Sequence, residues 1–502
     1  MKTDVIIIGS GIGGMTAASA LAQIGKKVVV LEKARDFGGL TTSFRRHRWR
    51  FNTGLHMHAF PSGKGQARHI ALWEALGGGR MTWKASNFRY MTPGRTWEMP
   101  SERKEIESSL KAMFPGEARL VKLYLDEIAS IAHDFDSYCL TACMAEHRVG
   151  AFAHRLAGSG IRKRDGKTMA EFFDAHGFSR ELRDHLSFFW DNHGAPPKHS
   201  GLVPHGLIAD TFVNGCYLPG ETSSAIAEGF RDRIEGSGGT ICTDEGVEDV
   251  LVEGGRVRGV STSRGRLLHA DSVISCAGAV ESYALLPAAH RPEPGAIQCG
   301  DTSFLQVYAG LEPDVRGEYP IRQGCYWYYP SSGTDVEPWN PDVDGFRPPY
   351  LGLQFLEDGT LAIMVAASWK PFDRWSGTSL RRRGEEYEEY MRKCGEGMLA
   401  LAEEAFPGLR SAIKYFETAS PLTVRDYTHH PGGRCYGVGG LPGRYTTEQL
   451  RPATPVKGFF LGGQDVCNPG VFGGFLGGLM AVVSLTRRDV GSEILKINGI
   501  SV

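Results

Sequence analysis

The sequence has almost no excess of either charge, no paired-cysteine motif and no apolar run long enough to cross a membrane. Its 502 residues carry 56 Lys and Arg against 57 Asp and Glu, so composition gives no reason to expect nucleic acid as a partner. The ten cysteines form no C-x-x-C pair and no zinc pattern, which predicts free thiols in a reducing cytoplasm and no metal site. The longest apolar run near the C-terminus, residues 471–485, contains four glycines and is too short for a bilayer.

Little sequence precedes the first apolar run. That run begins about three residues from Met1, which leaves no room for a signal peptide. The chain is long enough for two or more domains, each with a full core. With 41% hydrophobic and 23% charged residues it has an ordinary globular composition, and we expect it in the cytoplasm.

A glycine-rich motif follows the first apolar run. Residues 5–8 suit a strand buried on both faces, and residues 9–14 match G-x-G-x-x-G. A helix is predicted over 15–24, and a second buried strand over 28–31 ends at Glu32. Glycines allow a tight turn and the close approach of a pyrophosphate, while the acid is placed for a ribose 2′-OH. This unit predicts a dinucleotide site, with NAD and FAD both open, formed by Gly9, Ser10, Gly11, Ile12, Gly13, Gly14 and Glu32.

Later segments predict further parts of the same nucleotide-binding unit. Gly38 and Gly39 lie at a distance from Glu32 that suits a loop folding back over the dinucleotide. Residues 267–278 predict a buried strand that ends in a glycine turn against the nucleotide, and 458–465 predict a strand and loop before a last apolar helix. These segments add Lys33, Gly38, Gly39, Leu40, Thr41, Thr42, Ala277, Gly278 and Gly463 to the predicted cofactor-binding residues.

The middle of the chain predicts a second unit made of helices and an antiparallel sheet. Strand-like runs at 303–311, 326–329 and 361–367 alternate with loops rich in Pro, Gly and Asp, and one face of such a sheet can cover a ligand. Residues 147–167 mix apolar side chains with six Arg and Lys. That pattern is typical of a segment lying on an anionic membrane surface, although a solvated helix and loop explains it equally well.

Together these features resemble the flavin-dependent superfamily that contains amine oxidases, phytoene desaturases, carotenoid isomerases and retinol saturase. The strongest resemblance is to the retinol saturase and carotenoid isomerase branch. Residues 51–56, Phe-Asn-Thr-Gly-Leu-His, resemble its Phe-Asp-x-Gly-x-His stretch, and 420–423, 434–437 and 463–465 are similar to parts of retinol saturase. Asn52 stands where Asp is usual, and Glu221 stands where the second Gly of a pair is usual. These departures concern the substrate rather than the cofactor.

The resemblance implies an α/β fold, with a Rossmann-like FAD-binding domain of the GR2 flavoprotein type and a discontinuous substrate domain. The first would comprise 1–71, 214–294 and 438–502. The second, 72–213 and 295–437, would be built on a mixed or antiparallel sheet plus helices. FAD would meet Val247 at its adenine, Asp465 at its ribityl or phosphate portion, Gly473, Gly474 and Phe475 at the flavin carbonyl edge, and Gly54, Leu55 and His56 beside the flavin.

We therefore predict an FAD-dependent oxidoreductase that exchanges a hydride between flavin N5 and a hydrophobic isoprenoid or polyene, as saturase or desaturase. His56 is the first candidate for the proton donor or acceptor, and Glu221 is the second. An apolar tunnel should hold the substrate, with residues 188–190, 326–329 and Phe355 as candidates for its lining. A redox-neutral cis–trans isomerase, an FAD-dependent amine oxidase and a non-catalytic prenyl-binding carrier stay open as alternatives. The expected partners are the small hydrophobic substrate, an electron partner and a membrane surface at 147–167.

Overall fold

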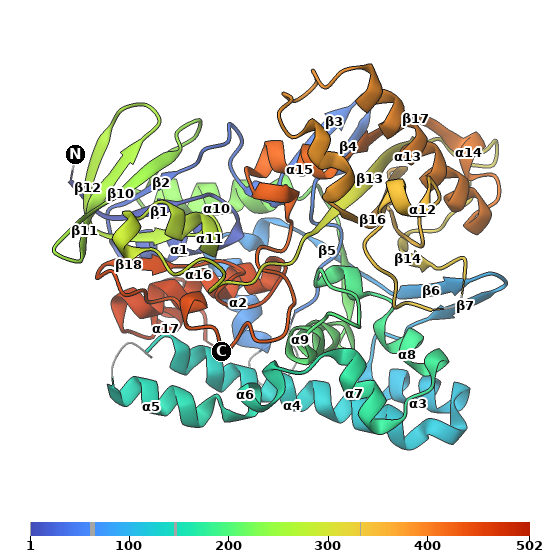
Figure 1. The fold of residues 1–502 in the computed structure, drawn as a ribbon, viewed down its shortest axis with the longest axis horizontal. Helices are drawn as coiled ribbons and strands as arrows, with labels where there is room; N and C mark the ends of the chain where they lie inside the picture. The colour runs from blue at the N-terminus through green and yellow to red at the C-terminus, as the bar shows by residue number, and fades with distance from the viewer. Residues whose placement is uncertain (1, 61–65, 145–147, 332, 502) are drawn as a thin grey trace.

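The computed structural model describes residues 2–60, 66–144, 148–331 and 333–501, which build two sheets joined by helices (Figure 1). The first sheet has the strand order β10-β11-β12-β1-β2-β9, with β18 pairing with the end of β12. β1 is parallel to β2, β2 to β9, and β12 to both β1 and β18, whereas β10, β11 and β12 form an antiparallel meander. The strands are β1 (Lys2–Ile8), β2 (Val28–Leu31), β9 (Thr240–Cys242), β10 (Val247–Glu253), β11 (Arg256–Thr262), β12 (Leu267–Ser275) and β18 (Phe459–Leu461).

Strand β1 is buried on both faces, as its β-branched residues predict. Val5 and Ile7 pack into the core beneath the helices, while Ile6 and Ile8 pack into a separate core beneath the β10–β12 meander. The helices on the first side are α1 (Ile12–Gln23), α2 (Gln66–Leu76), α10 (Ser224–Gly236), α16 (Val471–Thr486) and α17 (Val490–Ile497). The short α11 (Ala279–Ala284) follows β12 on the other side. The predicted Rossmann-like unit is therefore confirmed.

The second sheet has the order β17-β13-β16-β15-β14-β6-β7. It is mixed, because β14 and β6 pair in parallel while all other neighbouring strands in this sheet pair antiparallel. Its strands are β6 (Phe88–Thr92), β7 (Arg95–Glu98), β13 (Thr302–Leu311), β14 (Gly324–Tyr328), β15 (Leu351–Phe355), β16 (Thr360–Ser368) and β17 (Ile413–Ala419). Two small hairpin-like sheets complete the strands: β3 (Ser43–Arg46) with β4 (Trp49–Asn52), and β5 (Trp83–Ser86) with β8 (Cys216–Pro219). The mixed sheet agrees with the predicted fold class.

A layer of helices runs along one edge of the molecule, at the bottom of Figure 1. It contains α3 (Arg103–Met113), α4 (Ala118–Ala142), α5 (Arg148–Ala157), α6 (Ser159–Asp165), α7 (Met169–His176), α8 (Arg180–Ser187) and α9 (Leu202–Phe212). The second sheet also packs against α13 (Glu385–Ala405), followed by α14 (Leu409–Ala412) and α15 (Pro421–Thr428), and α12 (Pro341–Asp344) precedes β15. None of the helices in the described part of the chain has the length and hydropathy that a bilayer crossing requires.

The strands sort between the two sheets along the predicted ranges. Every strand of the first sheet comes from 1–71, 214–294 or 438–502, and every strand of the second from 72–213 or 295–437. The predicted boundary after residue 71 falls inside α2, whose buried side chains belong to the core of the first sheet. The domain boundaries themselves stay a prediction.

Candidate dinucleotide and active site

The glycines of the first motif have two different surroundings. Gly9 has a φ of +89°, and a Cβ on Gly14 would lie 1.9 Å from the Gly9 carbonyl oxygen, so the turn and the start of α1 need both glycines. Gly11 adopts an extended conformation open to any residue, with φ −60° and ψ 173°. A Cβ on Gly11 would meet no described atom within 4 Å. The fold therefore does not require glycine at 11, and its missing side chain leaves a cradle at the start of α1.

Helix α16 begins beside α1. A Cβ on Gly474 would lie 2.5 Å from Ile12 Cγ2, and one on Gly478 would lie 2.4 Å from the Gly13 carbonyl oxygen. The two helices therefore pack backbone to backbone, with their N-termini side by side. The first N–H groups of a helix have no partner within it, and its N-terminal dipole is positive. Two such ends at one place form a binding site for anionic groups such as a pyrophosphate.

The Glu32 carboxylate is fixed at the ends of β1 and β2. Its Oε2 accepts hydrogen bonds from Ser10 N at 2.7 Å and Ser10 Oγ at 2.8 Å, and its Oε1 accepts one from Ala34 N at 2.7 Å. A carboxylate can accept about four hydrogen bonds, so an acceptor position remains for a ribose hydroxyl. The contact of Glu32 with a ribose stays a prediction.

The loop after β2 folds back onto the glycine motif, as its two glycines suggest. Gly38 N donates to Ser10 Oγ at 3.0 Å, and a Cβ on Gly39 would lie 3.1 Å from Gly11 Cα. Thr41 is buried, and a Cβ on Gly54 would lie 2.9 Å from Leu40 Cβ. The predicted residues 38–42 and 54–55 thus form one wall of the cradle beside Gly11.

Asp465 lies where three segments meet. Its Oδ2 accepts from Ala279 N at 2.7 Å, and its Oδ1 accepts from Val438 N at 2.9 Å. The carboxylate thus ties the C-terminal loop to the turn at 277–278, where Gly278 has a φ of +100°. A Cβ on Gly13 would lie 2.5 Å from Gly463 Cα, so this loop also contacts the start of α1. The proposed contact of Asp465 with a cofactor stays a prediction.

The remaining predicted cofactor residues lie around these groups. Val247 is half-buried at the start of β10, and Ala277 is half-buried after β12. Gly473 lies in the first turn of α16, where a Cβ would collide with Asn468 O. The Phe475 ring is fully buried and packs against Trp73, so only its backbone is available to a ligand.

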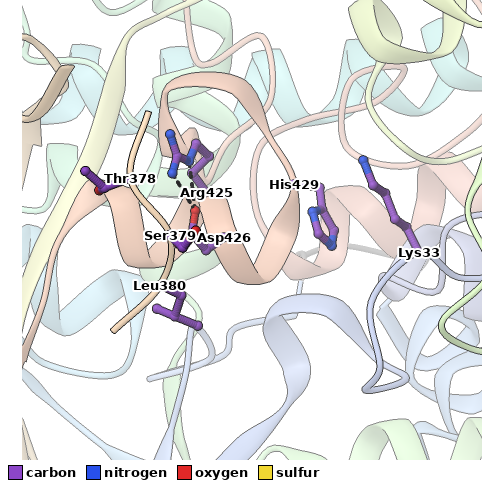
Figure 2. A pocket seen from close by; sticks show the side chains of 7 residues that line it. All are labelled: Lys33, Thr378, Ser379, Leu380, Arg425, Asp426 and His429. Atoms are coloured by element: carbon purple, nitrogen blue, oxygen red, sulfur yellow. Dashed lines mark hydrogen bonds and ion pairs between the residues drawn. The ribbon is translucent and has the colours of Figure 1, made fainter. Parts of the chain in front are cut away.

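Lys33, directly after Glu32, borders an open pocket of about 470 Å³ (Figure 2). On the opposite wall, Arg425 Nε and Nη2 donate to Asp426 Oδ1 at 2.9 and 2.7 Å. Figure 2 shows His429 on the side of Lys33, away from this ion pair. No sequence motif indicates this pocket, because its two walls are almost 400 positions apart and meet only in the fold. It is lined by Lys33, Thr378, Ser379, Leu380, Arg425, Asp426 and His429.

One face of the second sheet, which we call the inner face, keeps a small residual exposure on β13 and β16 that the other face lacks. On β13 and β16, Leu305, Val307, Ile363 and Val365 are fully buried, whereas their alternate neighbours Phe304, Gln306, Ala362 and Met364 stay 7–8% exposed. Successive strand residues point to opposite faces, so this alternation places the residual exposure on one face. Pairing across the strands continues that face through Gly352 to Trp327. The inner face comprises Phe304, Gln306, Trp327, Gly352, Gln354, Ala362 and Met364.

His56 lies against this inner face and is held by Gln354. Gln354 Nε2 donates to the His56 carbonyl oxygen, and Gln354 Oε1 lies 3.1 Å from His56 Nδ1. This pairing assigns the ring proton to Nδ1. His56 Nε2 is buried and has no hydrogen-bond partner among the described residues. Burial lowers the pKa of His56 to about 4, so at pH 7 its Nε2 can accept a proton but has none to donate.

Asp191 lies on the same face and had no motif to reveal it. It belongs to the short 3₁₀ turn Trp190–Asn192 and is 5% exposed. Trp327 Nε1 donates to its Oδ1 at 2.9 Å, and the Tyr350 hydroxyl donates to its Oδ2 at 3.3 Å. Burial raises the pKa of Asp191 to about 7, against these hydrogen bonds, which favour the charged form. Gln354 is the polar residue in the otherwise apolar strand β15. This exception in the sequence is a signal for the site that was overlooked.

Glu221 and several of the predicted tunnel aromatics do not belong to the inner face. Glu221 is exposed in the bend before α10, and its catalytic role stays a prediction. Three of the aromatics expected to line the tunnel, Tyr326, Tyr328 and Phe355, lie on the face opposite Gln354, because side chains alternate along β14 and β15. On that face Tyr326 packs on Phe406, and Phe355 packs on Tyr319.

Comparisons with known proteins agree with this architecture. Residues 7–76 match the family model of the NAD(P)-binding Rossmann-like domain. The chain is 27% identical to all-trans-retinol 13,14-reductase of Rattus norvegicus, over 98% of this chain and 87% of that protein. It is 24% identical to a chloroplastic prolycopene isomerase of Daucus carota, over 93% of this chain and 77% of that protein. The solved structure of cyclohexylamine oxidase from Brevibacterium oxydans covers 98% of this chain and 100% of its own, with a TM-score of 0.59 and 18% identity, and so shares the fold.

Proposed function

We propose that this chain, which belongs to the retinol saturase and carotenoid isomerase-like family with the amine oxidase fold, is an FAD-dependent oxidoreductase acting on carbon–carbon bonds of a hydrophobic isoprenoid or polyene. One observation carries the proposal. Residues 54–56 run from the wall of the dinucleotide cradle to the inner face of the second sheet, where Gln354 holds His56. A redox cofactor in the cradle would therefore lie next to a buried and largely apolar face of the second sheet.

The residues of the cradle fit FAD. Gly11 leaves room for a pyrophosphate, the starts of α1 and α16 offer N–H groups, and Glu32 retains an acceptor position for a ribose. Bound FAD would supply hydride exchange with a substrate carbon. The protein's own contribution is to exclude water, to hold the substrate against the inner face and to manage the proton at the neighbouring carbon.

The inner face suits a polyene better than an amine. Of its seven residues, all but Gln306 and Gln354 are apolar, aromatic or glycine. A polyene needs only apolar contact, whereas an amine cation would need an aromatic cage or a fixed acceptor, for which the Asp191 carboxyl is the candidate beside this face. The rat relative is named for reduction of a retinol double bond and the carrot relative for isomerisation of a polyene, so both names concern polyenes.

Flavin titration and product analysis test this function. Purified protein is titrated with FAD and followed by quenching of flavin fluorescence, and the complex is then incubated with all-trans-retinol under a chemical reductant. We expect saturable FAD binding and a product heavier by two hydrogen atoms. A product of unchanged mass but altered retention would favour the isomerase, and failure to bind FAD would refute the proposal.

We also propose that the end of α4 and helix α5 contact a membrane surface. Leu140 and Leu156 are 62% and 67% exposed, and Thr141 Oγ1 lies 3.0 Å from His154 Nδ1 where the two helices pack. Arg164 does not contribute a free cation as predicted, because Glu127 and Asp134 of α4 pair with it at 2.6 and 2.8 Å. His147, at the start of the predicted segment, lies outside the described residues. A lipophilic substrate would reach the enzyme most easily from such a surface.

A further inference from the structure

Asp191 is an acidic side chain with no basic partner in a buried site. No Lys, Arg or His among the described residues pairs with its carboxyl group, and its partners are neutral. Trp327 and Tyr350 hold its two oxygens, and Asn192 Nδ2 donates to Oδ1 at 3.1 Å. A buried carboxyl without a cation favours its protonated form, because desolvation penalises the charge. The site therefore contains a carboxylic acid that can both give up and regain a proton.

A second buried aspartate shows what a structural role looks like in this chain. Asp184 on α8 accepts from Thr334 N at 2.8 Å and from Thr334 Oγ1 at 3.2 Å, so its carboxyl group ties a loop to the helix. The carboxyl of Asp191 instead faces side chains at the middle of the second sheet. A Cβ on Gly352 would lie 3.5 Å from Asp191 Oδ2. A group at the Cβ position of residue 352 would thus be in van der Waals contact with this oxygen.

Asp191 and His56 meet the same strand on the same face. Gly352 lies beside Asp191, and Gln354, two residues further along β15, holds His56. Two strand residues span roughly 7 Å, so a chain of conjugated carbons lying across Gly352 can reach both groups. His56 is neutral and offers an acceptor at Nε2, whereas Asp191 offers the proton. Titratable groups pushed in opposite directions by burial are a common mark of an acid and a base at one site.

We propose that Asp191 is the acid that protonates the substrate carbon next to the one that exchanges hydride. This inference rests on the proposed function. In the saturating direction the double bond takes a hydride from reduced flavin at one carbon and the carboxyl proton of Asp191 at the other, so that two C–H bonds form and the π bond is lost. The flavin is oxidised by two electrons, and the Asp191 carboxylate, held by Trp327 and Tyr350, recovers its proton from water.

The substitution Asp191→Asn tests the assignment, with Asp184→Asn as the matched buried control. General-acid catalysis contributes roughly 10²–10⁴-fold, so the Asp191→Asn enzyme should saturate retinol slower by about that factor. It should still bind FAD with wild-type affinity, because Asp191 packs against the second sheet and not in the cradle. Asp184→Asn should keep the wild-type rate. Wild-type activity in Asp191→Asn would overturn this inference alone, whereas a wild-type enzyme inactive on every polyene would overturn the proposed function and this inference with it.

A measurement without cofactor gives an independent readout. Infrared difference spectra of the apoprotein across neutral pH should show the carbonyl band of a protonated carboxyl group that titrates near pH 7, present in Asp184→Asn and absent in Asp191→Asn. If Asp191→Asn fails to fold, Tyr350→Phe replaces it. That variant loses a hydroxyl that stabilises the charged carboxylate, so the band should titrate at higher pH, and the rate should decline at higher pH than in wild type. A band that persists in Asp191→Asn, or an unmoved titration in Tyr350→Phe, would refute the assignment.

Discussion

At the scale of single residues, burial acts on His56 and Asp191 in opposite directions. It lowers the pKa of His56 to about 4 and raises that of Asp191 to about 7, since in each case the charged form loses its hydration. At pH 7 the ring is neutral and a large share of the carboxyl groups is protonated. His56 can therefore accept a proton but cannot donate one at pH 7. The role of proton donor, which the sequence suggested for His56 as well, we assign to Asp191, which lies in no sequence motif.

The pKa of His56 predicts a pH-dependent stability. An unfolded chain protonates this ring as the pH falls through about 6.5, whereas the folded protein resists protonation down to about pH 4. Folding therefore loses about 3 kcal/mol of free energy over that window through this group alone. In His56→Gln the free energy of unfolding should fall less over the same window by about that amount. Urea unfolding of both proteins at neutral and mildly acidic pH measures this difference.

The other buried histidines, such as His58 and His205, titrate in both proteins and cancel in this comparison. Parallel curves of unfolding free energy against pH for wild type and His56→Gln would show that the ring is not held neutral by burial.

At the scale of elements, the start of α1 separates a glycine needed for folding from one that leaves space for a ligand. A Cβ on Gly14 would lie 1.9 Å from the Gly9 carbonyl, so Gly14→Ala should lower the free energy of unfolding by about 1–3 kcal/mol. Gly11→Ala should change it by no more than about 0.5 kcal/mol, because the backbone is extended and no described atom lies near. Chemical denaturation of the two apoproteins measures both values.

The same pair separates folding from cofactor binding. Gly11→Ala places a methyl group in the cradle and should weaken FAD binding at least tenfold, the equivalent of about 1.4 kcal/mol, although its apoprotein is as stable as wild type. Titration with FAD, followed by flavin fluorescence, measures this effect. Unaltered FAD affinity in Gly11→Ala would mean that the pyrophosphate lies elsewhere.

Local pattern accounts for the β1–α1–β2 unit, which follows its apolar periodicity, whereas two helices were missed for different reasons. Helix α9 was not predicted, because nearly all of its side chains are buried and it has no polar face to show a period. Helix α15 was missed although its start is marked, with Pro421 at the first position and a capping box from Ser420 to Thr423.

The candidate site also contains a part that could be predicted from the sequence and a part that could not. The cradle could be predicted, because Gly9 to Glu32 are local and each glycine has a geometric reason. Of the acid–base pair, His56 was named from the sequence, but Asp191 could not be, since it meets Trp327 and Tyr350 over sequence separations of more than a hundred residues. Which face of β14 and β15 looks inward depends on a register fixed only in the folded sheet.

At the scale of the whole molecule, the proposed function assigns the cofactor to the first sheet and the substrate to the second, and a layer of helices forms one edge of the molecule (Figure 1). Leu140 at the end of α4 and Leu156 on α5 lie on that layer. If this surface meets a membrane, each leucine contributes apolar burial worth about 1.5–3 kcal/mol when fully inserted. The exposure of Leu140 and Leu156 in the isolated protein would then serve membrane binding.

Binding to vesicles tests that arrangement. Leu156→Glu should reduce co-sedimentation with vesicles of anionic phospholipid by roughly tenfold or more, because it removes apolar burial and adds a charge of the wrong sign. Val343→Glu on α12, where the valine is 78% exposed, is the matched control and should bind as wild type does. Equal binding by the two variants would place the membrane contact elsewhere or remove it.

The most direct test of the central claim is a single turnover without oxygen. The FAD complex is reduced chemically, freed of excess reductant and mixed with all-trans-retinol in deuterated water. We predict that the flavin is reoxidised in step with loss of one double bond, and that the product carries deuterium from the solvent at the protonated carbon. A flavin that stays reduced with retinol and with other polyenes, while the protein binds them, would contradict the account.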